Sequence, residues 1–195
     1  MPEKPSPTVE YTRRLYDDVR AWYQSADSKA QVALGIDGAF LAFLTSGLFS
    51  KPADLRTLVA SFSPWTWFFL GLMTLTMLGS IAAAMYCLWS RIYTEAQVQQ
   101  LVEQARKLSQ DQEVYKPTVM WFFQMVGALD PKTFRQTLAK VDLDFEIDAM
   151  ASEIQILSRN VRKKHGAANV GFLLAAVTLS LFLAAGISYG IKNVL

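Results

Sequence analysis

Residues 22–49 read WYQSADSKAQVALGIDGAFLAFLTSGLF, a polar, charged stretch that runs directly into a long apolar segment. Neither glycine nor proline separates the polar part, Trp22–Ala30, from the apolar part, Ala30–Phe49. The acid Asp27 and the base Lys29 therefore stand where a helix enters a lipid bilayer, a position that core packing does not explain. The stretch predicts a helix that joins an aqueous domain to a membrane domain.

Two further apolar runs, Trp65–Trp89 and Ala167–Ile191, carry no charged residue, and the run at 30–49 carries only Asp37. About 20 apolar residues in a helix cross the hydrocarbon layer, so all three runs are long enough. The chain is 52% hydrophobic, which is high for a soluble domain. We expect an all-α membrane protein with three long helices that span the membrane and extend into a cytoplasmic helical stalk.

The basic residues are distributed unevenly among the polar segments, and this predicts the topology. Five precede the first apolar run and eleven separate the second from the third, whereas only Lys51 and Arg56 lie between the first and second. The positive-inside rule then places the N-terminus in the cytoplasm. The proline-rich start has no apolar core of a signal peptide, so the first span is expected to be retained. We expect a multi-pass protein of the bacterial inner membrane.

These patterns give a domain plan. Its segments are a disordered tail at 1–9, a cytoplasmic helix at 10–29, the first span at 30–49, a periplasmic loop at 50–64, the second span at 65–89, a cytoplasmic helical stalk at 90–166, the third span at 167–191 and a periplasmic tail at 192–195. Residues 10–49 are expected to form one helix. The second span is expected to continue as a helix to about Val114, and a third helix to run from the cap Asp130 through His165.

Apolar residues at steps of three and four mark the helix faces that we expect to be buried. The first set is Tyr11, Leu15, Val19, Trp22, Ala26 and Ala30, and the second is Leu143, Ile147, Met150, Ile154, Leu157 and Val161. The second set is an a/d seam, which indicates a helix packed on other helices.

The stalk contains an apolar connector, 115–129, which straight helices would hold far from the bilayer. An apolar cluster of this size is unfavourable when it is exposed to water. We therefore expect the connector to fold back on the stalk, to be buried in an oligomer, to line a binding site or to lie on the membrane. Its aromatic residues Trp121, Phe122 and Phe123 could stack on a nucleobase, although aromatics at this spacing are more often core.

Several charged residues are candidates for function. Asp37 is an acid within an apolar run, and it either faces a pore or oligomer contact or bonds a neighbouring helix, for example at Arg91. Asp27 and Lys29 do not face each other on a helix, so each needs a different partner. For Asp27 we expect the basic run Arg159–Lys164, which would tie the first helix to the third.

Within that run, Arg159, Arg162 and Lys163 are candidates for a phosphate site. The alternative is that they only set topology and contact anionic lipid. Cys87 stands alone within a span and His165 is the only histidine, so neither a disulfide framework nor a metal cluster is indicated. No catalytic motif occurs, and we expect a protein that is not an enzyme and has no cofactor and no nucleic-acid partner.

Three motifs in order resemble a known family. They are Asp27-x-Lys29-Ala30 before the first span, Phe122-Phe123 in the middle region and Ile154-Gln-Ile-Leu157-Ser158-x-x-Val-x-x-Lys164 before the last span. Together they resemble the Pycsar transmembrane effectors, bacterial anti-phage proteins of the PycTM type, over most of the chain. The SLATT-type membrane effectors have a similar layout. The resemblance leads us to expect a small polar residue at position 37, so the acid Asp37 departs from it.

The resemblance implies that the cytoplasmic part binds cyclic CMP or cyclic UMP made by a neighbouring pyrimidine nucleotide cyclase, and that the spans then impair the inner membrane and cause abortive infection. It implies no ligand contacts residue by residue. Asp27, Lys29 and Asp37 are expected to couple the stalk to the lipid bilayer, within a homo-oligomer. The alternatives are a scaffolding membrane protein that assembles through its stalk and an oligomeric ion channel that uses Asp37.

Overall fold

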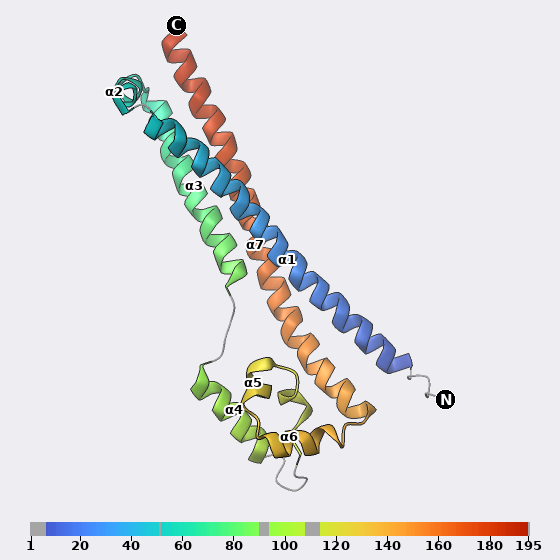
Figure 1. Ribbon diagram of the computed structural model, residues 1–195. Helices are drawn as coiled ribbons and strands as arrows, with labels where there is room; N and C mark the ends of the chain where they lie inside the picture. Colours follow the sequence, from blue (N-terminus) through green and yellow to red (C-terminus); the bar gives the residue numbers. More distant parts are fainter. Residues whose placement is uncertain (1–6, 51, 90–93, 108–113, 195) are drawn as a thin grey trace. The chain divides into compact units, whose positions relative to one another are not determined.

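The computed structural model describes residues 7–50, 52–89, 94–107 and 114–194 (Figure 1). Within these ranges no strand occurs, and three helices are long and apolar enough to cross a membrane, which confirms the all-α membrane fold. The elements are α1 (Pro7–Ser50), α2 (Pro52–Ala60), α3 (Pro64–Leu88), α4 (Glu95–Lys107), the 3-10 helix η1 (Pro117–Val119), α5 (Phe123–Ala128), α6 (Pro131–Leu138) and α7 (Leu143–Val194).

The chain divides into two compact units. The polar unit comprises Met1–Tyr23 and Ser90–Val161, and the membrane unit comprises Gln24–Trp89 and Arg162–Leu195. Helices α1 and α7 each contribute residues to both units without a break. The prediction of one helix over 10–49 is therefore confirmed, whereas the assignment of segments to cytoplasm and periplasm stays a prediction.

In the membrane unit, the buried positions of each helix form a seam. The seams include Ala26, Ala30, Ala33, Asp37 and Phe40 on α1, Met73, Met77, Ser80, Ala84 and Cys87 on α3, and Lys164, Ala168, Gly171, Ala175 and Thr178 on α7. Each set follows steps of four and three, an average of 3.5 residues. That spacing is typical of helices that pack side by side with a left-handed twist.

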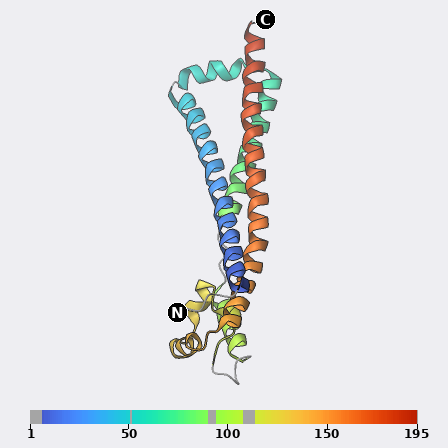
Figure 2. The same cartoon turned by 90° about the vertical axis from the view of Figure 1, so that its right-hand side faces the viewer.

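Side-chain size along the seams explains how the three helices of this unit diverge. Near Ala26–Ala33 the contacts are made by small residues, which let helix backbones approach closely. Further along, Phe40 packs edge-on against Phe182 with ring centroids 5.2 Å apart, in a cluster with Met73 and Met77. The bulkier contacts separate the helices, and α1 diverges from α7 toward its C-terminal end (Figure 2).

The end of α1 is joined to α3 by α2, which crosses between them (Figure 2). The predicted loop at 50–64 is thus helical over Pro52–Ala60, because proline at the first turn and the alanines and leucines that follow favour a helix. The predicted tail at 192–195 is also helical as far as Val194. There Lys192 donates a hydrogen bond to the Phe62 carbonyl oxygen, 3.0 Å away.

The prediction that the second span continues as a helix to Val114 is wrong. Helix α3 ends at Leu88, where Trp89 leaves the helical conformation while its N–H still bonds the Met85 carbonyl oxygen. Residues 90–93 lie outside the described ranges, and a new helix, α4, begins at Glu95. A capping box explains this start: the N–H of Thr94 donates to the Gln97 side chain and the N–H of Gln97 donates to the Thr94 hydroxyl.

The connector 115–129 folds into the polar unit. Its residues Tyr115, Val119 and Leu129 are buried in a cluster with Ala105 of α4. Tyr115 also links the segments by hydrogen bonds: its N–H donates to the Thr137 hydroxyl at 2.9 Å, and its own hydroxyl accepts from the Asp130 N–H at 3.0 Å. Of the expected alternatives, folding back within the stalk accounts for these buried residues.

The third predicted helix, from Asp130 to His165, is broken in two. Asp130 caps α6 as expected, since its carboxylate accepts from the Thr133 N–H at 2.9 Å. However, α6 ends at Leu138, and Asp142 caps a second helix by accepting from the Phe145 N–H at 2.8 Å. The sequence Ala139–Val141 offers no glycine or proline, so this break was missed. In the seam that begins at Leu143, that first residue is exposed, Met150 and Val161 are buried, and Ile147, Ile154 and Leu157 are partly buried.

The predicted buried face of α1 is confirmed at Val19, Ala26 and Ala30, and Leu15 is partly buried. It is wrong at Tyr11 and Trp22, which are exposed, and it missed Val9, which is buried. Steps of three and four do not distinguish neighbouring faces of a helix clearly. The face that packs against other helices is the one that contains Ala26, Ala30 and Ala33. Because α1 begins at Pro7, residues 7–9 of the predicted tail are helical, and residues 1–6 lie outside the described ranges.

We predict that Thr137→Val loosens the polar unit. The change keeps the shape of the side chain but leaves the buried Tyr115 N–H without its acceptor, at a cost of about 1–3 kcal/mol. Hydrogen exchange of residues 114–138 is expected to accelerate roughly tenfold or more. The same change at the exposed Thr118 is the control. Equal exchange in both variants would show that the Thr137 hydroxyl does not support this unit.

Candidate functional site: polar contacts between the membrane helices

An ion pair joins α1 to α7 where the charged part of α1 meets its apolar part. The Lys164 ammonium lies 2.5 Å from Oδ1 of Asp27, and the two side chains are only 11% and 29% exposed. The expectation that Asp27 pairs with the basic run 159–164 is confirmed at Lys164. Removing one partner of such a pair leaves a poorly solvated charge, which costs about 2 kcal/mol at this degree of exposure.

Helix α3 reaches the same level through Cys87. Its thiol sulfur lies 3.6 Å from the carbonyl oxygen of Ala26, the residue before Asp27, and both residues are buried. Three helices thus meet within one turn of the ion pair. We call Ala26, Asp27, Cys87 and Lys164 the junction.

Asp37 lies further along α1 and is almost completely buried, with 2% of its surface exposed. The hydroxyl oxygen of Ser80, on α3, lies 2.6 Å from Oδ2 of Asp37 and 2.9 Å from the carbonyl oxygen of Gly171 on α7. A Cβ added at Gly171 would lie 3.5 Å from the Ser80 carbonyl oxygen, so the two backbones are in close approach here. We call Asp37, Ser80 and Gly171 the triad.

The structure therefore favours a bond to a neighbouring helix for Asp37 over a pore-facing position. The partner is Ser80, and the suggested partner Arg91 lies outside the described ranges. Sequence reasoning missed Ser80, although a signal was present: it follows Met77 by three residues and precedes Ala84 by four, in phase with the buried seam of α3.

Two more polar contacts connect α3 to α7. The hydroxyls of Thr76 and Thr178 lie 2.9 Å apart, and those of Ser63, Thr66 and Ser188 lie 2.9–3.1 Å from one another. Along α7 the junction, the triad and the threonine pair follow at Lys164, Gly171 and Thr178, seven residues apart. Each of these contacts joins α7 to another helix and satisfies polar atoms that lipid would leave unpaired.

The remaining charged candidates lie on exposed faces. Lys29 is exposed on α1, and Arg159, Arg162 and Lys163 are exposed on α7. Arg159 belongs to the polar unit, whereas Arg162 and Lys163 belong to the membrane unit. No phosphate-binding geometry connects them, so a phosphate site at these residues stays a prediction.

The aromatic candidates divide between partly buried and exposed positions. Trp121 packs against Tyr16 of α1 with ring centroids 5.6 Å apart, and Phe122 lies beside Phe123 at 5.0 Å. Phe123 is exposed, while Trp121 remains 37% exposed. An aromatic face that is supported on one side and open on the other can accept a base by stacking.

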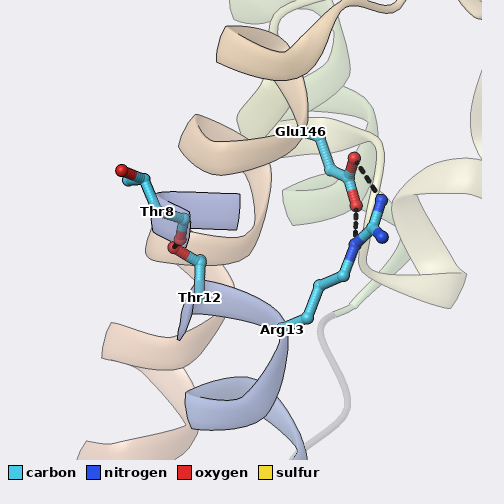
Figure 3. A network of polar contacts seen from close by, with 4 residues as sticks. All are labelled: Thr8, Thr12, Arg13 and Glu146. Carbon is cyan, nitrogen blue, oxygen red and sulfur yellow. Dashed lines mark hydrogen bonds and ion pairs between the residues drawn. The ribbon is translucent and has the colours of Figure 1, made fainter. Parts of the chain in front are cut away.

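Near that aromatic pair, Arg13 and Glu146 join α1 to α7 (Figure 3). The Arg13 guanidinium donates two hydrogen bonds, from Nε at 2.7 Å and from Nη2 at 2.8 Å, to the two oxygens of Glu146. These bonds hold the pKa of the Glu146 carboxyl below its ordinary value. In contrast, burial raises the pKa of Glu153, seven residues further along α7.

We predict that the junction ion pair is energetically coupled. Asp27→Asn and Lys164→Met each lower the unfolding temperature in detergent, because each leaves its partner charge poorly solvated. The double variant is expected to lose about 2 kcal/mol less than the sum of the single losses, as a double-mutant cycle measures. Lys163→Met, next in sequence but exposed, serves as the control. Strict additivity of the two changes would contradict the coupling.

A comparison with known protein families assigns the chain. It matches the family model described as PycTM, Pycsar effector protein domain, over residues 11–191. That range covers nearly the whole chain and includes the junction, the triad and residues of both units. No match is found among curated proteins or among solved structures. With its three membrane-spanning helices, this chain belongs to the Pycsar effector family and is a multi-pass membrane effector of anti-phage defence.

Proposed function

We propose that this effector binds a cyclic pyrimidine mononucleotide, cyclic CMP or cyclic UMP, through its polar unit and then impairs the bacterial inner membrane through its membrane unit. A pyrimidine nucleotide cyclase supplies the messenger on infection, and loss of membrane integrity aborts the infection. The protein acts as a homo-oligomer, without a cofactor and without catalysis. Family membership over residues 11–191 supports a cyclic nucleotide signalling context.

The observation that carries the proposal is the continuity of α1 and α7 through both units. A ligand that binds one packing of these helices more tightly than another shifts the population toward it. Because a helix transmits rotation and translation along its length, such a shift in the polar unit reaches the seams of the membrane unit. The uneven distribution of basic residues supports a cytoplasmic polar unit, where the messenger is made.

The ligand contacts that we propose are in the polar unit. Trp121, supported by Tyr16, stacks on the pyrimidine base, and Phe122 and Phe123 border the same segment. Arg159 offers a positive charge for the cyclic phosphate in this unit. Arg162 and Lys163 follow it on α7 but belong to the membrane unit, so a phosphate contact at these two residues stays a prediction from the sequence.

Isothermal titration calorimetry of the purified full-length protein with cyclic CMP and cyclic UMP tests binding. We predict saturable binding of one of them, with cyclic AMP as the ligand control. Trp121→Ala is expected to weaken binding roughly tenfold, since stacking on an aromatic side chain contributes about 1–3 kcal/mol per base. Trp65→Ala, an exposed tryptophan of the membrane unit, should leave affinity unchanged. If neither pyrimidine nucleotide binds, the proposed messenger is wrong.

A second experiment separates sensing from membrane damage. We predict that Asp27→Asn keeps the nucleotide affinity but abolishes growth arrest when a pyrimidine cyclase is co-expressed, because the junction lies in the membrane unit. Membrane permeability to a vital dye and calorimetric affinity are measured on the same variant. Lys29→Gln, an exposed neighbour, is the matched control. A loss of affinity in Asp27→Asn would place the binding site at the junction instead.

The channel alternative depends on Asp37, which is buried and accepts a hydrogen bond from Ser80 of α3. The scaffolding alternative was motivated in part by the apolar connector. Since Tyr115, Val119 and Leu129 are buried within their own unit, they are not available for assembly with a partner.

A further inference from the structure

A groove opens between α3 and α7 at the end of the membrane unit where α3 begins. Its volume is about 490 Å³, and its lining is almost entirely apolar. Sites that hold a small ligand usually measure about 300–1,000 Å³, so the groove is large enough for one. All of its lining residues belong to the membrane unit, and none of the contacts of the junction or the triad lies in it.

Side-chain size gives the groove its shape. Ala184 and Ser188 are four positions apart on α7, and both are partly buried, as is Phe69 of α3. Ile187 and Ile191 are also four positions apart on α7, but they are 65% and 56% exposed. Residues four apart lie on the same face of a helix. Small side chains thus form the floor of the groove and large ones its rim, which leaves room for a narrow apolar group.

The hydroxyl groups beside the groove already have partners. The hydroxyl oxygens of Ser63, Thr66 and Ser188 lie 2.9–3.1 Å from one another, and that of Ser63 also accepts from the Thr66 N–H at 3.0 Å. A sugar, a nucleotide or a peptide backbone would lose its hydrogen bonds to water on entering an apolar groove, whereas an alkyl chain has none to lose. The lining therefore favours an alkyl chain.

The groove begins at the membrane surface and runs into the bilayer. The span α3 begins at Pro64, and the exposed Trp65 and Trp67 follow at once, as is typical of the membrane–water interface. On α7 the groove extends from Lys192 back to Ala184, eight positions or about 12 Å along the helix. One leaflet of the hydrocarbon layer is about 15 Å deep, so the groove follows an acyl chain through most of its leaflet.

A positive charge stands at the polar end of the groove. Among the described residues of the lining, Lys192 is the only charged one. Its ammonium group donates to the Phe62 carbonyl oxygen at 3.0 Å, and it belongs to none of the ion pairs in the described part of the chain. An ammonium group has three N–H donors, so donors remain for an anion beside the groove. The charge complements the phosphate of a lipid whose acyl chain fills the groove.

We propose that the groove is a binding site for one anionic phospholipid of the membrane, with an acyl chain between α3 and α7 and the phosphate at Lys192. The lipid packs against both helices at the end of the unit where α1 diverges from α7 (Figure 2). It thereby supports the α3–α7 pair where the third helix contributes least. The site does not depend on the proposed nucleotide, because it lies within the membrane unit.

Native mass spectrometry of the full-length protein in detergent tests the site with phosphatidylglycerol as the probe. We expect one tightly held lipid per chain, and weaker binding of the zwitterionic phosphatidylcholine. Lys192→Gln is expected to weaken binding of phosphatidylglycerol roughly fivefold, the usual effect of one basic residue near anionic lipid. Arg56→Gln, at an exposed basic residue of α2, is the control. Equal binding of both lipids by the wild-type protein would leave only ordinary boundary lipid, and the proposal would fail.

A second pair of variants tests the groove itself. Ala184→Leu places a larger side chain on the floor and is expected to abolish the tight binding of phosphatidylglycerol. Gly186→Leu, two positions further on, is the matched control, since an added Cβ there meets nothing within 4 Å and Gly186 does not line the groove. Unfolding temperatures without lipid show that both variants fold, and added phosphatidylglycerol should raise that of Gly186→Leu but not that of Ala184→Leu.

Two further results would overturn the proposal. Glycerol 3-phosphate carries the phosphate without an acyl chain, and binding of this probe as tight as that of phosphatidylglycerol would mean that the apolar groove plays no part. The same spectra give the number of chains in each complex. If Ala184→Leu changes that number and leaves lipid binding intact, the groove is a contact between copies of the chain and not a lipid site.

Discussion

Hydrocarbon offers no partner for a hydrogen bond, and the arrangement of the membrane unit depends on this constraint. Every polar side chain that enters the seams must find its partner on another helix, which fixes how α1, α3 and α7 are rotated. Thr76 meets Thr178, and Ser80 meets both Asp37 and Gly171. Small residues between these contacts bring the backbones close enough for such short side chains to reach. Packing of small residues brings the three helices close together, and the polar contacts fix the rotation of each helix about its axis.

The sequence alone predicted the features that depend on composition. Apolar length identified the three spans, and the charge of Asp27 demanded a basic partner, found at Lys164. It failed where a local hydrogen bond decides the outcome. Helix α4 starts at a capping box around Thr94, and α7 starts at the cap Asp142, yet both caps resemble ordinary polar residues in sequence. The hydrogen-bond partner of Asp37, Ser80, was also not predicted, because a serine within an apolar run does not show which residue it bonds.

The two units have different kinds of core. The membrane unit is held by long seams along three helices, with a polar contact at about each second turn. The polar unit instead has a compact cluster around Tyr115, tied by the hydrogen bonds of that residue to Thr137 and Asp130. The core of the polar unit is therefore local to α4, the connector and α6, whereas the seams of the membrane unit extend along three helices.

Because α1 and α7 run unbroken through both units, the number of residues in each helix is a quantity that evolution must conserve. One inserted residue turns everything beyond it by about 100° and shifts it by about 1.5 Å. Insertions of seven residues, made in both helices together, nearly restore the phase of a seam with 3.5-residue spacing. Helix α3 ends at Leu88 and carries no such restriction. An exchange of polar units between two members of the family would therefore have to keep the phase of both helices, so only certain helix lengths are compatible with each other.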